Sequence, residues 1–218
     1  VVFLESVDGR IHLQEAIPVI RAGKPVFIDK PAAGSLADAI AIFDLAKKHN
    51  VPCFSSSSMR YDPGIRGLLK NEQLGTITGA MTWGPCSYQE GIPDMFFYGI
   101  HGIEGLFVLM GTGCETVTRV QTKDTDVVSG VWRGGRIGTY RGIRGSKAEF
   151  GALAFGSKAI VPAARGGVYE SLGGEIGRFF KTGKPPVTAE ETLEVFAFME
   201  AADESKRQGG KPVSIASV

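Results

Sequence analysis

Two segments of the sequence carry side chains that could move a proton, and Lys30 marks the first. Residues 25–29 form an apolar run with the pattern of a buried strand, and Lys30 follows directly. In an open α/β sheet the functional crevice lies beyond the carboxyl ends of the strands. A lysine at such an end can hold a substrate oxygen electrostatically or help to lower the pKa of a hydroxyl group. The alternative is a solvated lysine that only closes the strand.

The second segment contains His101 and Glu104, three residues apart in a stretch that is otherwise apolar and rich in glycine. Positions i and i+3 share one face of a helix, so both side chains could point into one cleft. Histidine exchanges protons near neutral pH, and a neighbouring carboxylate could orient it or bind a substrate. The alternative is a packed structural histidine. Glycines at 99, 102 and 105 weaken a helix, which suggests close approach by a ligand or another chain.

The strands that must position Lys30 follow a regular pattern over the first 55 residues. Residues 1–4, 25–29 and 51–54 are short apolar runs typical of strands buried in a parallel sheet. Helical patterns separate them. Strand, helix, strand, helix, strand in this length is typical of a parallel, doubly wound sheet.

Two helices are predicted between these strands. The first should end near Gly23, a residue type that favours helix C-termini, although Pro18 conflicts with a regular helix unless it lies in the first turn or kinks the helix. The second begins after Ser35, which can cap it together with Asp38 three residues on. The predicted apolar face of the second helix consists of Leu36, Ala39, Ile40 and Phe43.

After Ser58 the pattern changes to alternating segments joined by glycine-containing turns, which is typical of a mostly antiparallel sheet. Helices are expected near 65–70, at 99–110, and twice after the main group of strands. The last helix has Thr188 and Glu191 as a capping box and Gly209-Gly210 as its stop. We therefore expect two domains, residues 1–58 and 59–218. The predicted strands of the second domain are residues 76–83, 116–122, 126–132, 137–144, 149–155 and 212–215.

The composition narrows the classes of function. The 218 residues include 24 Lys+Arg and 23 Asp+Glu, a net charge of +1, which gives no general attraction to nucleic acid or to an anionic membrane. The longest nearly apolar stretch, residues 99–111, is shorter than the roughly 20 residues of a membrane-spanning helix. Three cysteines favour free thiols in a reducing cytoplasm, and the spacing of the cysteines and of the three histidines indicates no metal site.

Several motifs, in their order and spacing, point to one family. Asp29-Lys30-Pro31 is similar to a Glu-Lys-Pro motif, and His101 and Glu104 match a catalytic histidine and the acidic residue that usually follows it. These features resemble the Gfo/Idh/MocA family of NAD(P)-dependent oxidoreductases, which act mainly on sugars, cyclitols and related polyols. The resemblance covers essentially the whole chain. Its other motifs are His12, Ala22-Gly23-Lys24, Met59-Arg60-Tyr61-Asp62-Pro63, and residues 73–77, 184–188 and 200–205.

The resemblance implies a fold, α/β followed by α+β. The first part is the C-terminal part of a doubly wound parallel Rossmann sheet, and the second is a mostly antiparallel, open-faced sheet with helices on one side. The open face implies a homodimer or homotetramer. The family's reaction transfers a hydride between the nicotinamide of NAD or NADP and a sugar, cyclitol or related polyol.

The resemblance also implies roles for individual residues. His101 is expected to be the acid/base, Lys30 the electrostatic and orienting group, and Glu104 a third catalytic residue that orients the histidine or binds a substrate hydroxyl. The residues predicted to bind the cofactor are Ser6, His12, Asp29, Lys30 and Arg60. The residues predicted to bind the substrate, at the rim of the pocket, are Tyr61, Tyr98 and Glu104, and Arg60 is a further candidate for that rim.

Two features depart from the family pattern. Phe97 stands four residues before His101, where the family usually has an aspartate. The nucleotide fingerprint Gly-x-Gly-x-x-Gly is also absent, because the pair Gly111 and Gly113 is followed by Thr116 at the third position. The chain begins at what resembles the family's fourth strand, so we expect the half of the sheet that holds the cofactor pyrophosphate to lie upstream of these residues.

Two other functions stay open. An NAD-dependent glycoside hydrolase of the same superfamily would use the same residues, and release of an aglycone without net reduction of the cofactor would distinguish it. A non-catalytic sugar or nucleotide sensor is the third reading, favoured by Phe97 and by the missing fingerprint. The sequence identifies neither the substrate nor the choice between NAD and NADP.

Overall fold

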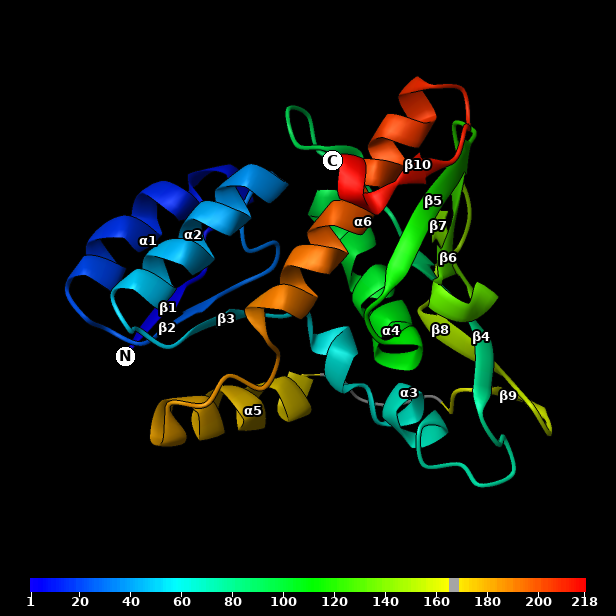
Figure 1. The fold of residues 1–218 in the computed structure, drawn as a ribbon, viewed down its shortest axis with the longest axis horizontal. Helices are drawn as coiled ribbons and strands as arrows, with labels where there is room; N and C mark the ends of the chain where they lie inside the picture. The colour runs from blue at the N-terminus through cyan, green and yellow to red at the C-terminus, as the bar shows by residue number, and fades with distance from the viewer. Residues whose placement is uncertain (165–168) are drawn as a thin grey trace.

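The computed structural model of the protein describes residues 1–164 and 169–218. The first of its two sheets is parallel and has three strands in the order β1 (Val2–Leu4), β2 (Val26–Ile28) and β3 (Cys53–Ser55) (Figure 1). The register pairs Leu4 with Ile28 and Ile28 with Ser55, so the carboxyl ends of all three strands lie at one edge. β2 and β3 are fully buried, as continuous apolar runs predict.

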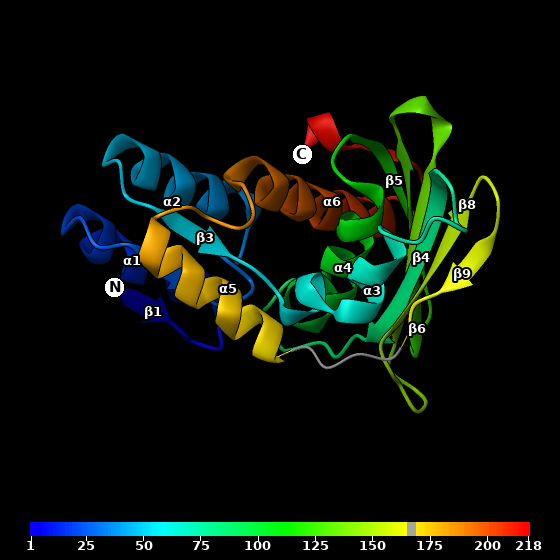
Figure 2. The ribbon, with the colours of Figure 1, turned by 90° about the horizontal axis from the view of Figure 1, so that it is seen from below.

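Helices α1 (His12–Arg21) and α2 (Leu36–Lys48) pack side by side on one face of this sheet (Figure 2). Pro18 lies inside α1, and Gly23 follows the helix with a φ of +68°, which glycine adopts without strain. In α2 the predicted place of Ile40 on the apolar face is wrong, because its side chain is 40% exposed. Ile42 is buried instead, since it shares one helix face with Ala39, Phe43 and Ala46.

The opposite face of the parallel sheet is covered by a helix from much later in the chain, α5 (Tyr169–Thr182) (Figure 2). Phe179 of α5 packs edge-on against Phe54 of β3 at 4.7 Å between ring centroids, and Phe54 contacts Phe27 of β2 at 5.0 Å. Helices therefore cover both faces of the sheet, as in a doubly wound fold. Because α5 packs on residues of the first predicted domain, the packing extends across the predicted boundary at residue 58.

The second sheet has seven strands in the order β10-β5-β6-β7-β4-β8-β9. All neighbours are antiparallel except β4 and β7, which confirms a mostly antiparallel sheet. The sequence did not predict β9, which lengthens the edge beyond β8. The strands are β4 (Ile77–Pro85), β5 (Cys114–Gln121), β6 (Thr125–Trp132), β7 (Ile137–Ile143), β8 (Gly151–Gly156), β9 (Ile160–Pro162) and β10 (Val213–Ser214).

Helices α4 (Ile100–Met110) and α6 (Ala189–Arg207) lie on one face of the large sheet, and the short helix α3 (Pro63–Leu68) lies beside α4 (Figure 2). A Cβ at position 102 would lie 2.3 Å from Cε2 of Tyr140, so this glycine lets α4 approach strand β7 closely. The sheet thus explains the glycine at 102. Within residues 1–164 and 169–218, none of the helices combines the length and the hydropathy of a membrane-spanning segment.

The other face of the large sheet carries exposed apolar side chains. Alternate residues of β6 and β7 point away from the helices, and among them Val131 is 38% and Ile137 is 54% exposed. Val120 on the neighbouring strand β5 is 63% exposed. A sheet with one covered and one open face was expected, and the open face carries exposed apolar side chains among polar ones.

Candidate active site

Lys30 lies directly beyond the carboxyl end of β2, at the edge where the three parallel strands end. Its Nζ donates a hydrogen bond to the carbonyl oxygen of Phe97 at 3.3 Å and lies 5.6 Å from the ring centroid of Tyr98. Partial burial lowers the pKa of this lysine, while nearby Asp29 and Glu104 favour its charged form. Lys30 therefore faces the segment that precedes His101. Phe97, which stands where the family usually has an aspartate, accepts the lysine hydrogen bond through its backbone oxygen.

A π-helix at Met95–Gly99 runs directly into α4 and presents His101 to this edge. The sequence did not predict this turn, and π-helical turns are frequent at functional sites. The His101 ring lies 4.9 Å from the Tyr98 ring and 5.9 Å from the Phe150 ring, centroid to centroid. The predicted neighbours Lys30, Tyr98 and His101 are thus brought together from two distant parts of the chain.

Ser57 holds the inner side of the His101 ring, and the sequence analysis missed it. Its Oγ lies 2.6 Å from Nδ1 of His101 and accepts a hydrogen bond from the backbone N–H of Met59 at 3.1 Å. The signal available in the sequence was the run of four serines, residues 55–58, that begins at the end of β3. Because the crevice of such a sheet lies beyond the strand ends, these serines were placed to contribute.

Burial sets the protonation of His101. Burial, together with the positive charge of Lys30, lowers the pKa of the imidazole to about 3. The ring is therefore neutral at physiological pH. In the part of the chain that the structure describes, Nδ1 is bound to Ser57 and Nε2 is the nitrogen available to another group.

Glu104 shares a helix face with His101, as predicted, but its carboxylate binds three other groups. The side chain is buried, and Oε1 accepts a hydrogen bond from the backbone N–H of Ser57 at 2.9 Å. Oε2 accepts from Oγ of Ser56 at 3.1 Å and from Nε of Arg60 at 2.8 Å. Among the described residues, Glu104 thus reaches the histidine through Ser57 and not by a direct hydrogen bond.

Arg60 is buried between two carboxylates. Its guanidinium pairs with Glu104 and with Glu191, and these charges raise its pKa although burial opposes this. Thr188 caps α6 as predicted, accepting from the Glu191 N–H at 3.1 Å, but the Glu191 carboxylate binds Arg60 instead of closing the capping box. Since Arg60 is 6% exposed, the predicted direct contact with a cofactor or substrate is replaced by an ion pair that ties α6 to the site.

Two other predicted residues are too buried for direct contact with a ligand. His12 is completely buried, with Nδ1 2.9 Å from the Pro31 carbonyl oxygen and Nε2 2.9 Å from the Ser6 carbonyl oxygen. It holds together the loops that follow β1 and β2, so its predicted contact with a cofactor becomes a supporting one. Tyr61 is 2% exposed and packs under the guanidinium of Arg66, so it does not lie at a pocket rim as predicted.

Ser6 and Asp29 lie beyond β1 and β2 and stay partly exposed. The hydroxyl of Ser6 donates to the Glu15 carboxylate, and the backbone N–H of Asp29 donates to the Leu4 carbonyl oxygen at 2.8 Å. Both residues therefore keep side-chain atoms near the strand edge that carries Lys30.

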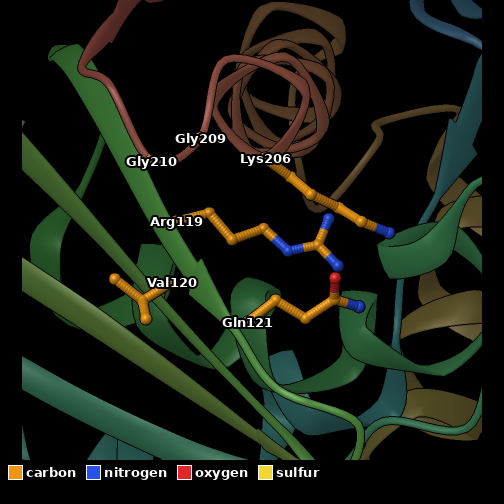
Figure 3. Close-up of a pocket in the computed structure, with 6 residues that line it drawn as sticks. All are labelled: Arg119, Val120, Gln121, Lys206, Gly209 and Gly210. Atoms are coloured by element: carbon orange, nitrogen blue, oxygen red, sulfur yellow. The ribbon is translucent and has the colours of Figure 1, made fainter.

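A second polar region lies at the far end of α6, around Arg119 of β5. A cavity of about 280 Å³ opens beside it, lined by Arg119, Val120, Gln121, Lys206, Gly209 and Gly210 (Figure 3). Figure 3 shows Arg119 and Gln121 extending to one side of the strand and Val120 to the other. The Arg119 side chain is fully buried and binds Asp94, Asp126 and Asp203, so its charge is neutralised by carboxylates.

The geometry at the parallel strand ends can do specific chemistry. The Lys30 ammonium and the neutral His101 imidazole both lie beside the Tyr98 ring, and each can bind an oxygen atom of a ligand. Such a pair can exchange a proton with that oxygen and stabilise negative charge that develops on it. The arrangement suits the interconversion of an alcohol and a carbonyl group.

Comparisons with solved structures show the fold. A probable dehydrogenase from Thermotoga maritima superposes with a TM-score of 0.84 and 20% identity, covering 100% of this chain and 80% of that one. Scyllo-inositol dehydrogenase from Lactobacillus casei, with bound NAD(H) and scyllo-inositol, gives 0.83 and 16%, covering 99% and 80%. An oxidoreductase from Agrobacterium radiobacter, in complex with NAD+, L-tartaric acid and magnesium, gives 0.81 and 15%, covering 96% and 78%. No protein-family model matches the chain.

Proposed function

We propose that this protein is an NAD(P)-dependent oxidoreductase that transfers a hydride between nicotinamide and a carbon atom of a sugar, cyclitol or related polyol. Its fold is that of Gfo/Idh/MocA-type dehydrogenases, and solved structures of this fold hold NAD or NAD(H). The observation that carries the proposal is the meeting of Lys30 and His101 beside Tyr98 at the carboxyl edge of the parallel sheet. Fold alone does not establish an activity, so the argument rests on these side chains.

In the proposed reaction His101 exchanges the proton of the reacting oxygen through Nε2. The ring is neutral, and among the described residues its hydrogen-bond partner lies at Nδ1, which leaves Nε2 for the reacting oxygen. Lys30 stabilises the negative charge that develops on the same oxygen, and in a half-buried position its charge acts strongly. Glu104 holds the backbone of Ser57 and is therefore a positioning residue. Tyr98, beside both groups, would contact the substrate.

We also propose that the strand edge holds one end of a dinucleotide. Ser6, Asp29 and Lys30 follow β1 and β2 and would hold the nicotinamide end, while His12 and Arg60 would support them from beneath. When bound, the nicotinamide supplies or takes the hydride. The residues of this chain hold the substrate oxygen and move its proton.

The test is a titration of the protein isolated from its natural source with NAD(H) and NADP(H), followed by tryptophan fluorescence, with the intact mass measured on the same sample. The protein is then assayed on a panel of sugars and cyclitols. Binding of one dinucleotide and polyol-dependent change in nicotinamide absorbance are expected. Binding of neither dinucleotide overturns the proposal, and aglycone release without net reduction favours the hydrolase.

Lys30→Ala tests the electrostatic role. We expect a fall in both turnover and substrate affinity, because the substituted site loses the charge that holds the oxygen. Lys24→Ala is the matched control, since Lys24 is an exposed lysine at the opposite end of β2. If Lys30→Ala changes neither kinetic parameter, Lys30 is a surface lysine.

We also propose that the protein forms a homodimer or homotetramer through the open face of the large sheet. Val131 and Ile137 support this, because they lie directly opposite each other on β6 and β7 and both are exposed. Val120, opposite Val127 further along the same face, extends the exposed apolar surface. Ile137→Asp should shift the mass measured by light scattering towards the monomer. An unchanged mass, or a wild-type monomer at micromolar concentration, contradicts the proposal.

A further inference from the structure

The contact between Ser57 and His101 contains information about where the ring proton lies. Ser57 is completely buried, and two groups of the described residues form hydrogen bonds with its Oγ. One is the backbone N–H of Met59, which can only donate. The other is Nδ1 of His101, which donates if it carries a hydrogen and accepts if it does not.

Counting donors and acceptors distinguishes the two tautomers of the neutral ring. A serine hydroxyl has one hydrogen and accepts through two lone pairs. If Nδ1 carried the proton, both lone pairs would be used and the buried Ser57 hydrogen would have no acceptor among the described residues. If Nδ1 is bare, the hydroxyl donates to it at 2.6 Å and every group is satisfied. Buried polar groups are normally paired, so the second arrangement is favoured.

We propose that Ser57 is a positioning residue that holds neutral His101 in the tautomer with its hydrogen on Nε2, so that the ring presents an N–H donor to the substrate oxygen beside the Lys30 ammonium. This proposal deepens the proposed function, because only that function says which oxygen the donor meets. The tautomer itself follows from Ser57, Met59 and His101 alone.

The chemical nature of the residue at Nδ1 matters. A carboxylate at Nδ1 can only accept, so it holds the ring hydrogen on Nδ1 and leaves Nε2 bare as a base. A hydroxyl can also donate, which reverses the arrangement. Ser57 can still rotate to accept from Nδ1–H, but its own hydrogen then loses its acceptor. The serine therefore permits the base form and favours the donor form at rest.

The tautomer with hydrogen on Nε2 favours binding of the carbonyl form of the substrate over the alcohol form. A carbonyl oxygen accepts hydrogen bonds and does not donate, so it can bind both Lys30 Nζ and His101 Nε2–H. A neutral imidazole that polarises a carbonyl group in this way is an established catalytic device. The resting site is thus arranged to bind the carbonyl oxygen of the oxidised form of a polyol or sugar.

The closing experiment reads the tautomer by long-range proton–nitrogen NMR of the histidine side chains at neutral pH, with no cofactor or substrate. The protonated and bare ring nitrogens have widely separated nitrogen shifts. Loss of one set of signals in His101→Gln assigns His101 among the three histidines. In the wild type we expect a bare Nδ1 and a protonated Nε2. Ser57→Ala should shift the ring towards the Nδ1–H tautomer or a mixture.

Two variants separate the hydroxyl from general effects on the fold. Ser57→Thr keeps the hydroxyl and should keep the wild-type tautomer. Ser58→Ala removes the neighbouring buried serine, which makes no side-chain hydrogen bond in the described structure, and should also leave the tautomer unchanged. A protonated Nδ1 in the wild type overturns the proposal, and so does a tautomer that is identical in Ser57→Ala. Neither outcome depends on dinucleotide binding or turnover, so failure of the proposed function would be seen separately.

Discussion

Two buried polar regions of the molecule contain similar residue types but differ in how completely their charges are paired. The Arg119 cluster consists of Tyr88, Asp94, Arg119, Asp126 and Asp203. Its arginine donates to Asp126 at 3.0 Å, to Asp94 at 2.7 Å and to the Tyr88 hydroxyl at 2.8 Å, and pairs with Asp203. The site cluster consists of Lys30, Ser57, Tyr98, His101 and Glu104. There, within residues 1–164 and 169–218, Lys30 donates to one carbonyl oxygen and His101 forms a hydrogen bond through Nδ1 alone.

The difference supports a structural role for the Arg119 cluster and the proposed catalytic role for the site cluster. A buried charge that is surrounded by opposite charges fixes the elements that carry it, and breaking it is costly. A half-buried charge with spare donors has a shifted pKa and can still bind a ligand. Beside the site cluster, Arg60 pairs with Glu104, so the Glu104 charge is neutralised while Lys30 keeps donors free for a ligand.

The largest expected effect is on the reactivity of the site cluster. His101→Ala should lower turnover by about 10²- to 10⁴-fold, the usual contribution of a positioned acid/base, while cofactor affinity changes little. Turnover and dinucleotide affinity are measured separately. The control is His49→Ala, an exposed histidine at the end of α2. Wild-type turnover in His101→Ala would contradict the proton-transfer role of His101, and the site cluster would then be structural like the Arg119 cluster.

The next effect is on the stability of the Arg119 cluster. Arg119→Ala leaves buried carboxylates without their partner and should cost about 3–5 kcal/mol of unfolding free energy. Urea unfolding measures it. The control is Glu204→Gln, which alters a surface ion pair between Glu204 and Arg207 within α6. It should leave the urea midpoint unchanged. A loss equal to that of the control would mean that the cluster contributes no stability.

The two clusters should also respond to pH with opposite signs. The pKa of His101 is lowered from 6.5 to about 3, so the unfolded chain binds more protons and stability falls as pH drops from 6.5 towards 3. Burial raises the pKa of Asp203 from 3.8 to about 6 despite Arg119, so stability rises as pH drops from 6 towards 3.8. Each slope is at most about 1.4 kcal/mol per pH unit.

Urea midpoints across pH 4 to 7 in His101→Gln and Asp203→Asn separate these contributions. Relative to the wild type, His101→Gln should lose less stability on acidification, and Asp203→Asn should lose more. If both variants follow the wild-type profile, neither group changes its protonation as its surroundings indicate.

The smallest expected effect lies outside both clusters. It measures how much one neutral hydrogen bond contributes to the free energy of unfolding. Ser35 caps α2 by accepting from the Asp38 N–H at 3.1 Å, and Ser35→Ala should cost about 1 kcal/mol in urea unfolding. Ser35→Asp should restore most of this, because aspartate also caps helices well. A cost as large as that of Arg119→Ala would show that the cap, too, supports a wider network.

The local patterns predicted much of the framework. Apolar runs placed β2 and β3, and Thr188 and Ser35 marked the starts of two helices, because strand burial and helix capping depend on residues a few positions apart. The spacing of His101 and Glu104 correctly placed both on one helix face, since helical periodicity is also local. The motifs that resemble Gfo/Idh/MocA proteins predicted the fold confirmed by solved structures.

Other features depend on segments that are distant in sequence, and no local pattern contains them. The sequence by itself determined which side chains could exchange protons, namely Lys30 and His101. Only the tertiary structure decided that Ser57 binds Nδ1, that Glu191 turns from its cap to Arg60, and that α5 covers the parallel sheet. The physical reason is that hydrogen bonds and burial are satisfied in three dimensions, so the partner of a buried polar group is fixed by packing and not by neighbours along the chain.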